Sequence, residues 1–230
     1  MNQIDNLDFV HLHVHSEYSL VDGIIRINEL VDHTVELGYN SVALTDLTNL
    51  FGLIEFYRSA RKKGVKPIVG SEIKIAKDLD SISAPLVLLA MNKEGYINLT
   101  KLVSKAYVEG QAKGEPIVLF SWLEQFSDGI IALSGGMDGH IGNSVLAGNE
   151  QLSESRIDFF KKIFGDNFFI EIQRTGKPNE HEYNSSVLKL ASKKEIPVVA
   201  TNNVRFLNSV DPDISPSDFE AHEALSLIHI

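Results

Sequence analysis

The residues best suited to chemistry in this chain are three histidines near its start. The stretch HLHVHSEYS places His11, His13 and His15 at every second position. In an extended segment, residues two apart point to one face, with Cα atoms about 6.6 Å apart. Imidazoles at this spacing can share a metal ion or bind adjacent ions. For an isolated His-x-His pattern alone, however, hydrogen-bonded structural histidines are the stronger interpretation.

Two carboxylates elsewhere in the sequence make a metal site more plausible than structural histidines alone. Asp46 follows the apolar run SVALT, and Glu72 lies within KPIVGSEIKI. Taken alone, Asp46 is typical of a turn or cap residue, and Glu72 of a surface residue. Together with His13 and His15, they supply the imidazole and carboxylate ligands of a zinc- or manganese-type hydrolytic site.

The elements that must position these side chains alternate along the chain. Short apolar runs predict seven strands, at residues 9–14, 41–45, 66–75, 85–90, 129–134, 168–173 and 197–201. Amphipathic patterns between them predict helices at residues 27–38, 50–64, 155–165 and 182–195. This alternation predicts parallel strands joined by right-handed crossovers, in a closed or nearly closed β/α barrel. A doubly wound sheet is the alternative. In a barrel, functional residues gather at the C-terminal ends of the strands.

Composition narrows the function classes. The chain has 230 residues, 43% hydrophobic and 23% charged, which is typical of a globular protein. Its net charge of −10 disfavours a stand-alone nucleic-acid binder, because phosphate contacts need clustered Lys and Arg. The compact basic cluster at residues 58–66 is interpreted as the solvated end of a helix. The absence of cysteine excludes disulfides and thiolate metal sites and fits a reducing cytoplasm. No apolar run is long enough to predict a membrane span.

Several sequence blocks carry a family resemblance. They are VHLHVHSEYSLVDG (10–23), ALTDLTNLFGLIEFY (43–57), KPIVGSEI (66–73), GYINLTKLVSKAY (95–107), GIIALSGG (129–136) and PVVATNNVRFL (197–207). Together they resemble the PHP (polymerase and histidinol phosphatase) domain family, most closely the type at the N-terminus of the alpha subunit of bacterial DNA polymerase III. The resemblance extends from Phe9 to about Glu223. It implies an α/β fold, a distorted (β/α)7 barrel of the PHP type, over residues 1–224 of a longer polymerase chain.

The resemblance also implies a metal site that has lost most of its ligands. His13, His15, Asp46 and Glu72 occupy ligand positions of the family. Other family ligand positions hold Leu47, Pro85, Gly136, Thr175, Asn203 and Arg205. Leu, Pro and Gly offer no side-chain donor to a metal ion. Arg205 brings a permanent positive charge, and we expect it to fill the vacated space and pair with Asp46 or Glu72. The four retained residues are therefore vestigial metal ligands, with no catalytic residue and no cofactor expected. Zinc or manganese at a residual site is the alternative.

The implied function follows from that loss. The parent chain is expected to be a DNA-directed DNA polymerase, a nucleotidyltransferase of DNA replication in the cytoplasm. The present chain lacks the polymerase active site and is expected to be a structural or docking domain. Expected partners are the proofreading exonuclease subunit and the rest of the polymerase III holoenzyme, with DNA bound through absent C-terminal regions and no membrane contact. The alternative is an active metal-dependent PHP phosphoesterase, for proofreading, pyrophosphate cleavage or a histidinol-phosphatase-like reaction.

Three further segments carry expectations. The tail LSLIHI, residues 225–230, matches a translated sequencing adapter and is interpreted as non-native. The segment from Tyr107 to Trp122 contains glycines and is expected to be an irregular loop, with Trp122 anchoring a helix to the barrel. The glycine-rich GGMDGHIG, residues 135–142, lacks the ending of a phosphate-binding loop and predicts a tight turn into a helix.

Overall fold

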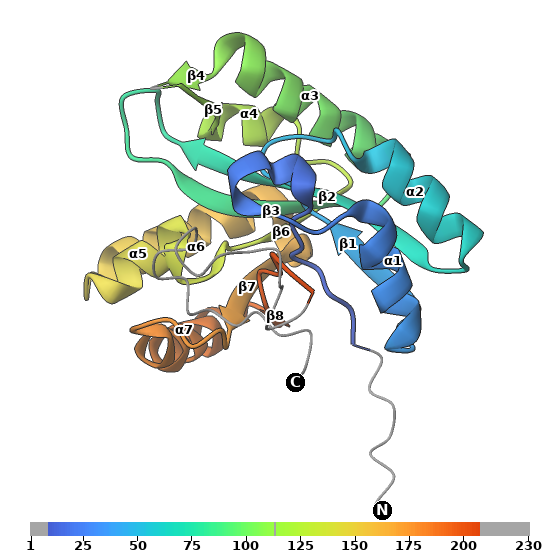
Figure 1. Cartoon of the computed structure of the whole chain (residues 1–230). Helices are drawn as coiled ribbons and strands as arrows, with labels where there is room; N and C mark the ends of the chain where they lie inside the picture. The colour runs from blue at the N-terminus through green and yellow to red at the C-terminus, as the bar shows by residue number, and fades with distance from the viewer. Residues whose placement is uncertain (1–8, 113, 208–230) are drawn as a thin grey trace, which may run out of the picture.

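The chain folds as a mixed sheet surrounded by helices, in a computed structural model that describes residues 9–112 and 114–207 (Figure 1). The strands are β1 (Ser41–Leu44), β2 (Lys66–Ala76), β3 (Ala84–Ala90), β4 (Gln111–Ala112), β5 (Glu115–Leu119), β6 (Ile130–Leu133), β7 (Phe168–Gln173) and β8 (Val198–Thr201). The helices are α1 (Ile27–Glu36), α2 (Leu53–Lys62), α3 (Lys93–Glu109), α4 (Phe120–Gln125), α5 (His140–Leu146), α6 (Glu150–Phe164) and α7 (Glu180–Lys194). Three 3-10 helices are η1 (Glu17–Asp22), η2 (Gly136–Asp138) and η3 (Gly165–Asn167).

The sheet order corrects the expectation of a wholly parallel barrel. The strands run β4-β5-β2-β3-β6-β7-β8, with β1 paired to β2. The pairs β1–β2, β6–β7 and β7–β8 are parallel, but β3 is antiparallel to both β2 and β6. The reason is the connection from β2 to β3, which spans only residues 77–83 and contains no helix. Two strands joined by so short a connection pair antiparallel, because a parallel pair needs a long crossover.

The first expected strand, residues 9–14, forms no ladder of its own. Instead, isolated bridges join His11 to Val42 in β1 and Val14 to Val204 beyond β8. Backbone hydrogen bonds connect this segment to its neighbours on either side: Ala43 N donates to His11 O (2.8 Å), and Val204 N donates to His13 O (2.9 Å). Residues 9–15, which we call the histidine segment, therefore lie between β1 and the chain just beyond β8, and single bridges connect them there. This is the distorted PHP-type barrel that the sequence predicts.

The segment from Tyr107 to Trp122 is regular, which corrects the expectation of an irregular loop. Helix α3 continues to Glu109, and the short strand β4 pairs antiparallel with β5. Strand β5 then pairs in parallel with the end of β2, with Ile117 opposite Lys74. The glycines stand only at the turns, since Gly114 has a φ of +84°. Trp122 is 8% exposed within the core, as expected for a residue that anchors its helix.

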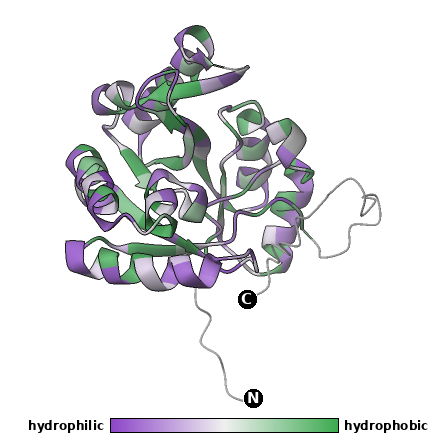
Figure 2. Ribbon diagram, turned by 90° about the vertical axis from the view of Figure 1, so that its left-hand side faces the viewer, coloured by the Kyte–Doolittle hydropathy of each residue, from purple (hydrophilic) through white to green (hydrophobic). Residues whose placement is uncertain are grey.

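The apolar residues separate into three clusters. The largest packs strands against α3, α4, α6 and α7, with Leu88, Leu99 and Phe160 among its buried members. A second cluster lies beneath α1 and α2 and includes Phe56. A third cluster lies inside the barrel and includes Ala43 and Leu133. Figure 2 shows hydrophobic strands inside and hydrophilic stretches on the outer helices. Within the described part of the chain, no helix is both long and apolar enough to cross a membrane.

The remaining sequence expectations divide by whether the structure describes them. In GGMDGHIG, Gly135 and Gly136 have φ values of +78° and +60°, and the chain turns through η2 directly into α5 as predicted. The non-native tail at residues 225–230, and the end of the proposed domain at residue 224, lie outside the described residues.

Candidate functional site

Four side chains from three separate elements meet inside the barrel. His13 and His15 come from the histidine segment, Glu72 from β2 and Glu171 from β7. His13 Nε2 lies 2.6 Å from Glu72 Oε2, and His13 Nδ1 lies 2.7 Å from Glu171 Oε1. His15 Nε2 lies 3.3 Å from His13 Nε2 and 3.4 Å from Glu72 Oε2. We call these four residues the polar cluster. The pairing of His13 with His15 on one face agrees with their spacing in the sequence.

Electrostatics in the polar cluster favour charge on both partners. Burial lowers the pKa of His13, but Glu171 and Glu72 outweigh that effect and raise it to about 9. Burial raises the pKa of Glu72 and of Glu171, yet hydrogen bonds and charge from His13 bring both below the ordinary value. The two carboxylates therefore favour the protonated form of His13. The pKa of His15 is lowered, chiefly by burial.

Glu171 is the cluster member that the sequence analysis did not select. Its Oε1 also accepts hydrogen bonds from Thr201 Oγ1 and from Gln173 Nε2 (3.1 Å). Its Oε2 is buried and has no partner in the described structure. The sequence contained one indication of this role, because Glu171 and Gln173 are polar at a spacing of two in an otherwise apolar strand.

Asp46 lies near this cluster but serves a different contact. Its Oδ1 accepts from Ser16 N (2.7 Å) and Ser19 Oγ (2.8 Å), and its Oδ2 accepts from Ser16 Oγ (2.8 Å). Ser19 Oγ also lies 3.0 Å from His15 Nδ1. These bonds attach the start of η1 and its N-cap to the end of β1. The carboxylate is therefore an anchor for η1 in this structure.

Arg205 does not pair as predicted. Its Nη1 donates to the backbone oxygen of Asp22 (3.0 Å) and lies 3.4 Å from the Asp22 carboxylate, so the expected pairing with Asp46 or Glu72 is wrong. The half-buried guanidinium points to the end of η1, where a carbonyl and a partly exposed carboxylate can both accept from it. Its charge still reaches the cluster, since it contributes to the lowered pKa of His15.

The third histidine of the opening motif is separate from the site. His11 is 5% exposed, and its ring packs edge-on against the rings of Phe9 and Tyr39, with centroid distances of 4.8 Å and 5.8 Å. Neither of its ring nitrogens has a hydrogen-bond partner in the described structure. Burial lowers its pKa to about 4. The His-x-His-x-His spacing therefore covers two environments, with only His13 and His15 in the polar cluster.

The residues present fit one metal ion better than several. One donor atom from each of His13, His15 and Glu72 lies within 4.8 Å of the others, and imidazole with carboxylate suits zinc. Asp46 does not join that group. At the other family positions, Leu47, Pro85 and Gly136 have no donor, while the Thr175 hydroxyl donates to Glu180 Oε1 (2.9 Å). Among the described residues, these three donors form a group that one ion could share.

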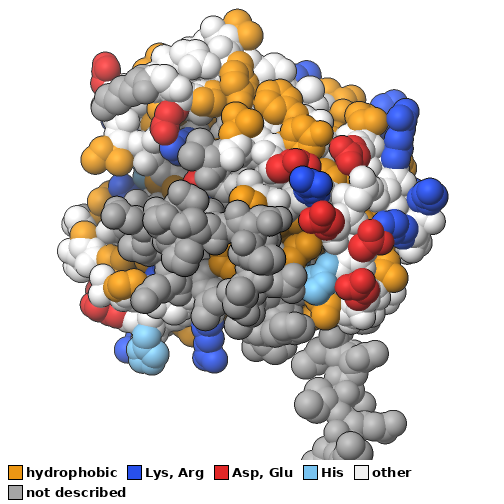
Figure 3. Space-filling view, viewed as in Figure 1, with side chains coloured by type: hydrophobic (Ala, Val, Ile, Leu, Met, Phe, Trp, Pro, Cys, Tyr) orange, Lys and Arg blue, Asp and Glu red, His pale blue; other side chains and the backbone are white. Residues whose placement is uncertain are grey.

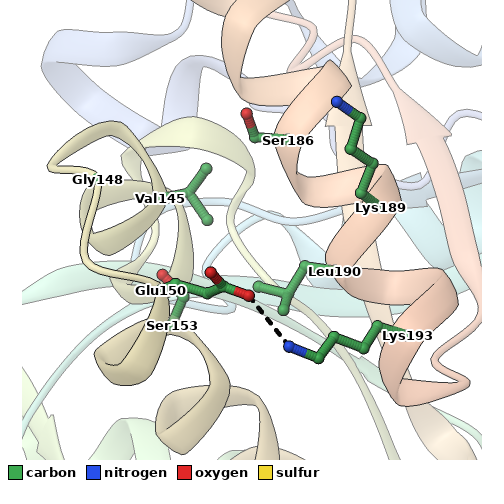
Figure 4. A pocket seen from close by; sticks show the side chains of 8 residues that line it. All are labelled: Val145, Gly148, Glu150, Ser153, Ser186, Lys189, Leu190 and Lys193. Atoms are coloured by element: carbon green, nitrogen blue, oxygen red, sulfur yellow. Dashed lines mark hydrogen bonds and ion pairs between the residues drawn. The ribbon is translucent and has the colours of Figure 1, made fainter.

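A surface hollow, separate from the polar cluster, lies outside the barrel between the α5–α6 connection and α7. Figure 4 shows Lys189, Ser186 and Leu190 on α7 facing Val145 and Ser153. Lys193 Nζ forms an ion pair with Glu150 (3.0 Å) across it. This ion pair joins two exposed side chains of α6 and α7, and none of the site residues predicted from the sequence lies there.

Comparison with known proteins agrees with the fold and the histidine motif. The model of the PHP domain family matches residues 11–175. DNA polymerase III subunit alpha of Escherichia coli K12 is 44% identical over 223 residues, which is 96% of this chain and 18% of that protein. The Vibrio cholerae protein of the same name is 41% identical over 222 residues, 96% of this chain and 19% of its own length. The chain thus spans about a fifth of the length of these relatives.

Solved structures support the same architecture at low identity. An amidohydrolase from Chromobacterium violaceum, solved with sulfate and no metal, superposes with a TM-score of 0.57 at 14% identity, covering 88% of this chain and 92% of that one. A Bifidobacterium adolescentis protein assigned to the metal-dependent phosphoesterases gives 0.53 at 13% identity, covering 86% and 87%. At such identities the likeness concerns the fold alone. With the family model matching most of its length and the barrel built as described, the chain belongs to the PHP domain family.

Proposed function

We propose that this chain is the N-terminal PHP region of a replicative DNA polymerase alpha subunit and acts there as a structural and docking domain. The relatives named DNA polymerase III subunit alpha match over 96% of the chain, which supports the first part. The observation that carries the second part is the polar cluster, in which the metal-binding histidine of the family pattern, His13, is held between Glu72 and Glu171.

Phosphoester hydrolysis places two demands that this cluster meets poorly. Multi-metal hydrolysis uses two ions about 3.5–4 Å apart, each with its own ligands. Here three donors approach one another, and both ring nitrogens of His13 are engaged by carboxylates. A substrate must also reach the ions, yet His13 is 2% exposed, His15 0% and Glu72 7%. A closed ionic network suits an internal brace of the barrel better than a hydrolytic centre.

The remaining parts of the proposal concern the parent protein. DNA-directed DNA synthesis is assigned to sequence beyond this chain, because the chain corresponds to 18% of the relatives' length. The PHP barrel supports the polymerase core and binds the proofreading exonuclease subunit within the holoenzyme, in the cytoplasm. DNA is bound through those other regions, since the present chain carries a net charge of −10.

Elemental analysis of purified protein without a histidine tag tests the catalytic part. We expect no stoichiometric zinc or manganese after dialysis, and no metal-dependent release of phosphate from a chromogenic phosphoester. One equivalent that is lost in the Glu72→Gln variant would identify a residual zinc site instead. Two or more tightly held equivalents, together with metal-dependent hydrolysis, would overturn the proposal.

Binding and synthesis assays test the docking part. The chain is expected to co-elute with the purified exonuclease subunit in size-exclusion chromatography and to incorporate no nucleotide on a primed template. A matched control is the same chain unfolded by heat and cooled. Failure of the native chain to bind the exonuclease subunit contradicts the docking role, while nucleotide incorporation by the chain alone contradicts the assignment of synthesis elsewhere.

A further inference from the structure

Four large apolar side chains are exposed on η1, on α2 and in the turn that precedes α2. Leu20 is 76% exposed, Phe51 63%, Ile54 60% and Tyr57 51%. The hydroxyl of Tyr18 in η1 donates to Glu55 of α2 at 3.3 Å, so the two elements are in contact. We call this surface the η1–α2 face. Single exposed apolar residues are ordinary, whereas a group of them on neighbouring elements marks an interaction surface.

The outer side of α2 combines these apolar residues with cations. Ile54, Arg58 and Lys62 follow a spacing of four, so they lie along one side of α2, and Phe51 stands in the turn before it. The same four residues line a groove that reaches Asn28 of α1. In Figure 3 hydrophobic side chains lie beside Lys and Arg over this region. Aromatic residues and Arg are the types most enriched in protein interfaces.

The cations on this face are available to a partner. Arg58, Arg61 and Lys62 are exposed, and none has a carboxylate within ion-pair distance in residues 9–112 and 114–207. Lys63 differs, because it forms an ion pair with Asp32 of α1. Unpaired cations concentrated at one helix end contrast with the net charge of −10 of the whole chain. Such a local excess of positive charge attracts acidic groups.

Backbone strain at Leu20 supports a role for the tip of η1. Leu20 has φ +61° and ψ −91° inside η1, a conformation that costs a non-glycine residue about 1–3 kcal/mol. The side chain that this backbone presents buries little within the chain, at 76% exposure. Strain that places an apolar side chain in solvent is typical of a contact residue rather than a packing residue.

We propose that the η1–α2 face docks an acidic amphipathic segment of a partner protein. The apolar side of that segment covers Leu20, Phe51 and Ile54, and its carboxylates pair with Arg58 and Lys62. This inference does not depend on the role of the polar cluster. Nucleic acid fits less well, because the exposed aliphatic side chains of Leu20 and Ile54 offer no hydrogen-bond donor to a phosphate backbone.

Fluorescence anisotropy with designed peptides tests the proposal on the intact chain. The probe is a labelled helix of about 16 residues, long enough for four turns, with Leu along one side and Glu on the other. We expect saturable binding that weakens at least about tenfold in the double variant Phe51→Ala/Ile54→Ser, and similarly in Arg58→Glu/Lys62→Glu. Ile82→Ser, at a residue 85% exposed between β2 and β3, and Lys93→Glu on α3 are the matched controls and should bind as the parent chain does.

Three comparison probes decide between occupants. A peptide with Lys in place of Glu lacks the ion pairs, and a Glu-rich peptide without an apolar side lacks the apolar contacts. Both should bind at least about tenfold more weakly. Tighter binding of a thymidine oligonucleotide than of the acidic helix would overturn the proposal in favour of nucleic acid. Self-association that disappears in the Phe51→Ala/Ile54→Ser variant would overturn it in favour of a second copy of the chain. Absence of binding to the acidic helix, or equal binding by all variants, would also refute it.

Discussion

The two ends of the barrel are built from the same strands but have opposite chemistry. Along β7, Phe169 belongs to the apolar end and Glu171 to the polar cluster, two residues apart and on the same face of the strand. Along β8, Val199 and Thr201 repeat this change, and along β2, Ile68 and Glu72 do so four residues apart. One end is therefore a packed apolar layer, and the other is a network of charged hydrogen bonds.

This difference shows how the same strands can meet two different physical requirements at their two ends. The apolar end stabilises the fold by removing apolar surface from water, and a charge buried there would have no partner. The polar end must pair every charge that it buries, because an isolated ion in the interior is costly. The carboxylates Glu72 and Glu171 are compensated by His13, which lies between them. A protonated imidazole and a metal ion meet the same electrostatic requirement.

The largest expected effect comes from breaking the polar end. In Glu171→Ala, His13 loses one of its two carboxylates, Thr201 loses its acceptor, and Gln173 Nε2 keeps only Thr201 Oγ1 as an acceptor. Removal of one partner from a buried ion pair costs about 3–5 kcal/mol. Urea unfolding should show this loss in the free energy of unfolding. Glu150→Ala is the control, since its ion pair is exposed and is expected to contribute about 0–1 kcal/mol. Equal stability of both variants would contradict a structural role for the polar cluster.

A cavity at the apolar end should cost slightly less and act independently. Leu133 is 1% exposed in the cluster that fills the barrel. Leu133→Ala is expected to lower the free energy of unfolding by roughly 3 kcal/mol, from lost burial and the cavity left behind. Combined with Glu171→Ala, the two losses should be additive to about 0.5 kcal/mol. Urea unfolding of the double variant checks this, and strong coupling would show that the two ends do not behave as separate regions.

The anchor of η1 should matter less for global stability than for local opening. Asp46→Asn keeps one oxygen acceptor for Ser16 and Ser19 but removes the charge and the second oxygen. We expect a loss of about 1–3 kcal/mol, since hydrogen bonds to charged groups are the stronger ones. Hydrogen exchange of the amides in η1 should accelerate while β7 is unaffected. Asp22→Asn, at the exposed ion pair with Arg205, is the control and should change exchange little.

The smallest effect concerns a buried histidine outside both regions. Burial lowers the pKa of His140, with a smaller opposing effect of its hydrogen bond to Ile75 O (2.9 Å) and a contribution from Arg156. Its folded pKa lies below the unfolded value, so its stabilising contribution is present above that value and is lost as pH falls through the folded pKa. His140→Gln keeps an N–H donor and removes the titration. Its free energy of unfolding should therefore fall less between pH 7 and pH 5 than that of the parent chain, and an identical slope would contradict this.

Local patterns predicted the parts of the fold that depend on local physics. The period of two placed His13 and His15 on one face, and their ring nitrogens do meet at 3.3 Å. Amphipathic periods located α1, α2, α6 and α7 to within a few residues. The lost ligand positions were read directly from residue types, because Leu47, Pro85 and Gly136 lack a donor in any fold. Residue chemistry and short-range periodicity were sufficient for these conclusions.

The errors concern pairings that local patterns do not specify, and those in the site join residues far apart in sequence. Residues 9–14 were expected to form a strand, but they form two isolated bridges. Strand β3 was expected to be parallel to its neighbours, but it is antiparallel to β2 because no helix lies in the connection between them. Arg205 bonded to Asp22, 183 positions away in the chain, rather than to Asp46. Glu171 escaped selection because its polarity acquires meaning only next to His13, 158 positions away.

The sequence by itself determined the family, the alternation of helices and strands, and the reduced donor set of the site. Only the tertiary structure decided that His13 lies between Glu72 and Glu171, that Asp46 anchors η1, and that His11 stays apart. The physical reason is that side-chain periodicity fixes the face on which a residue lies. Strand order and register then determine which faces meet, and these result from the packing of the whole chain.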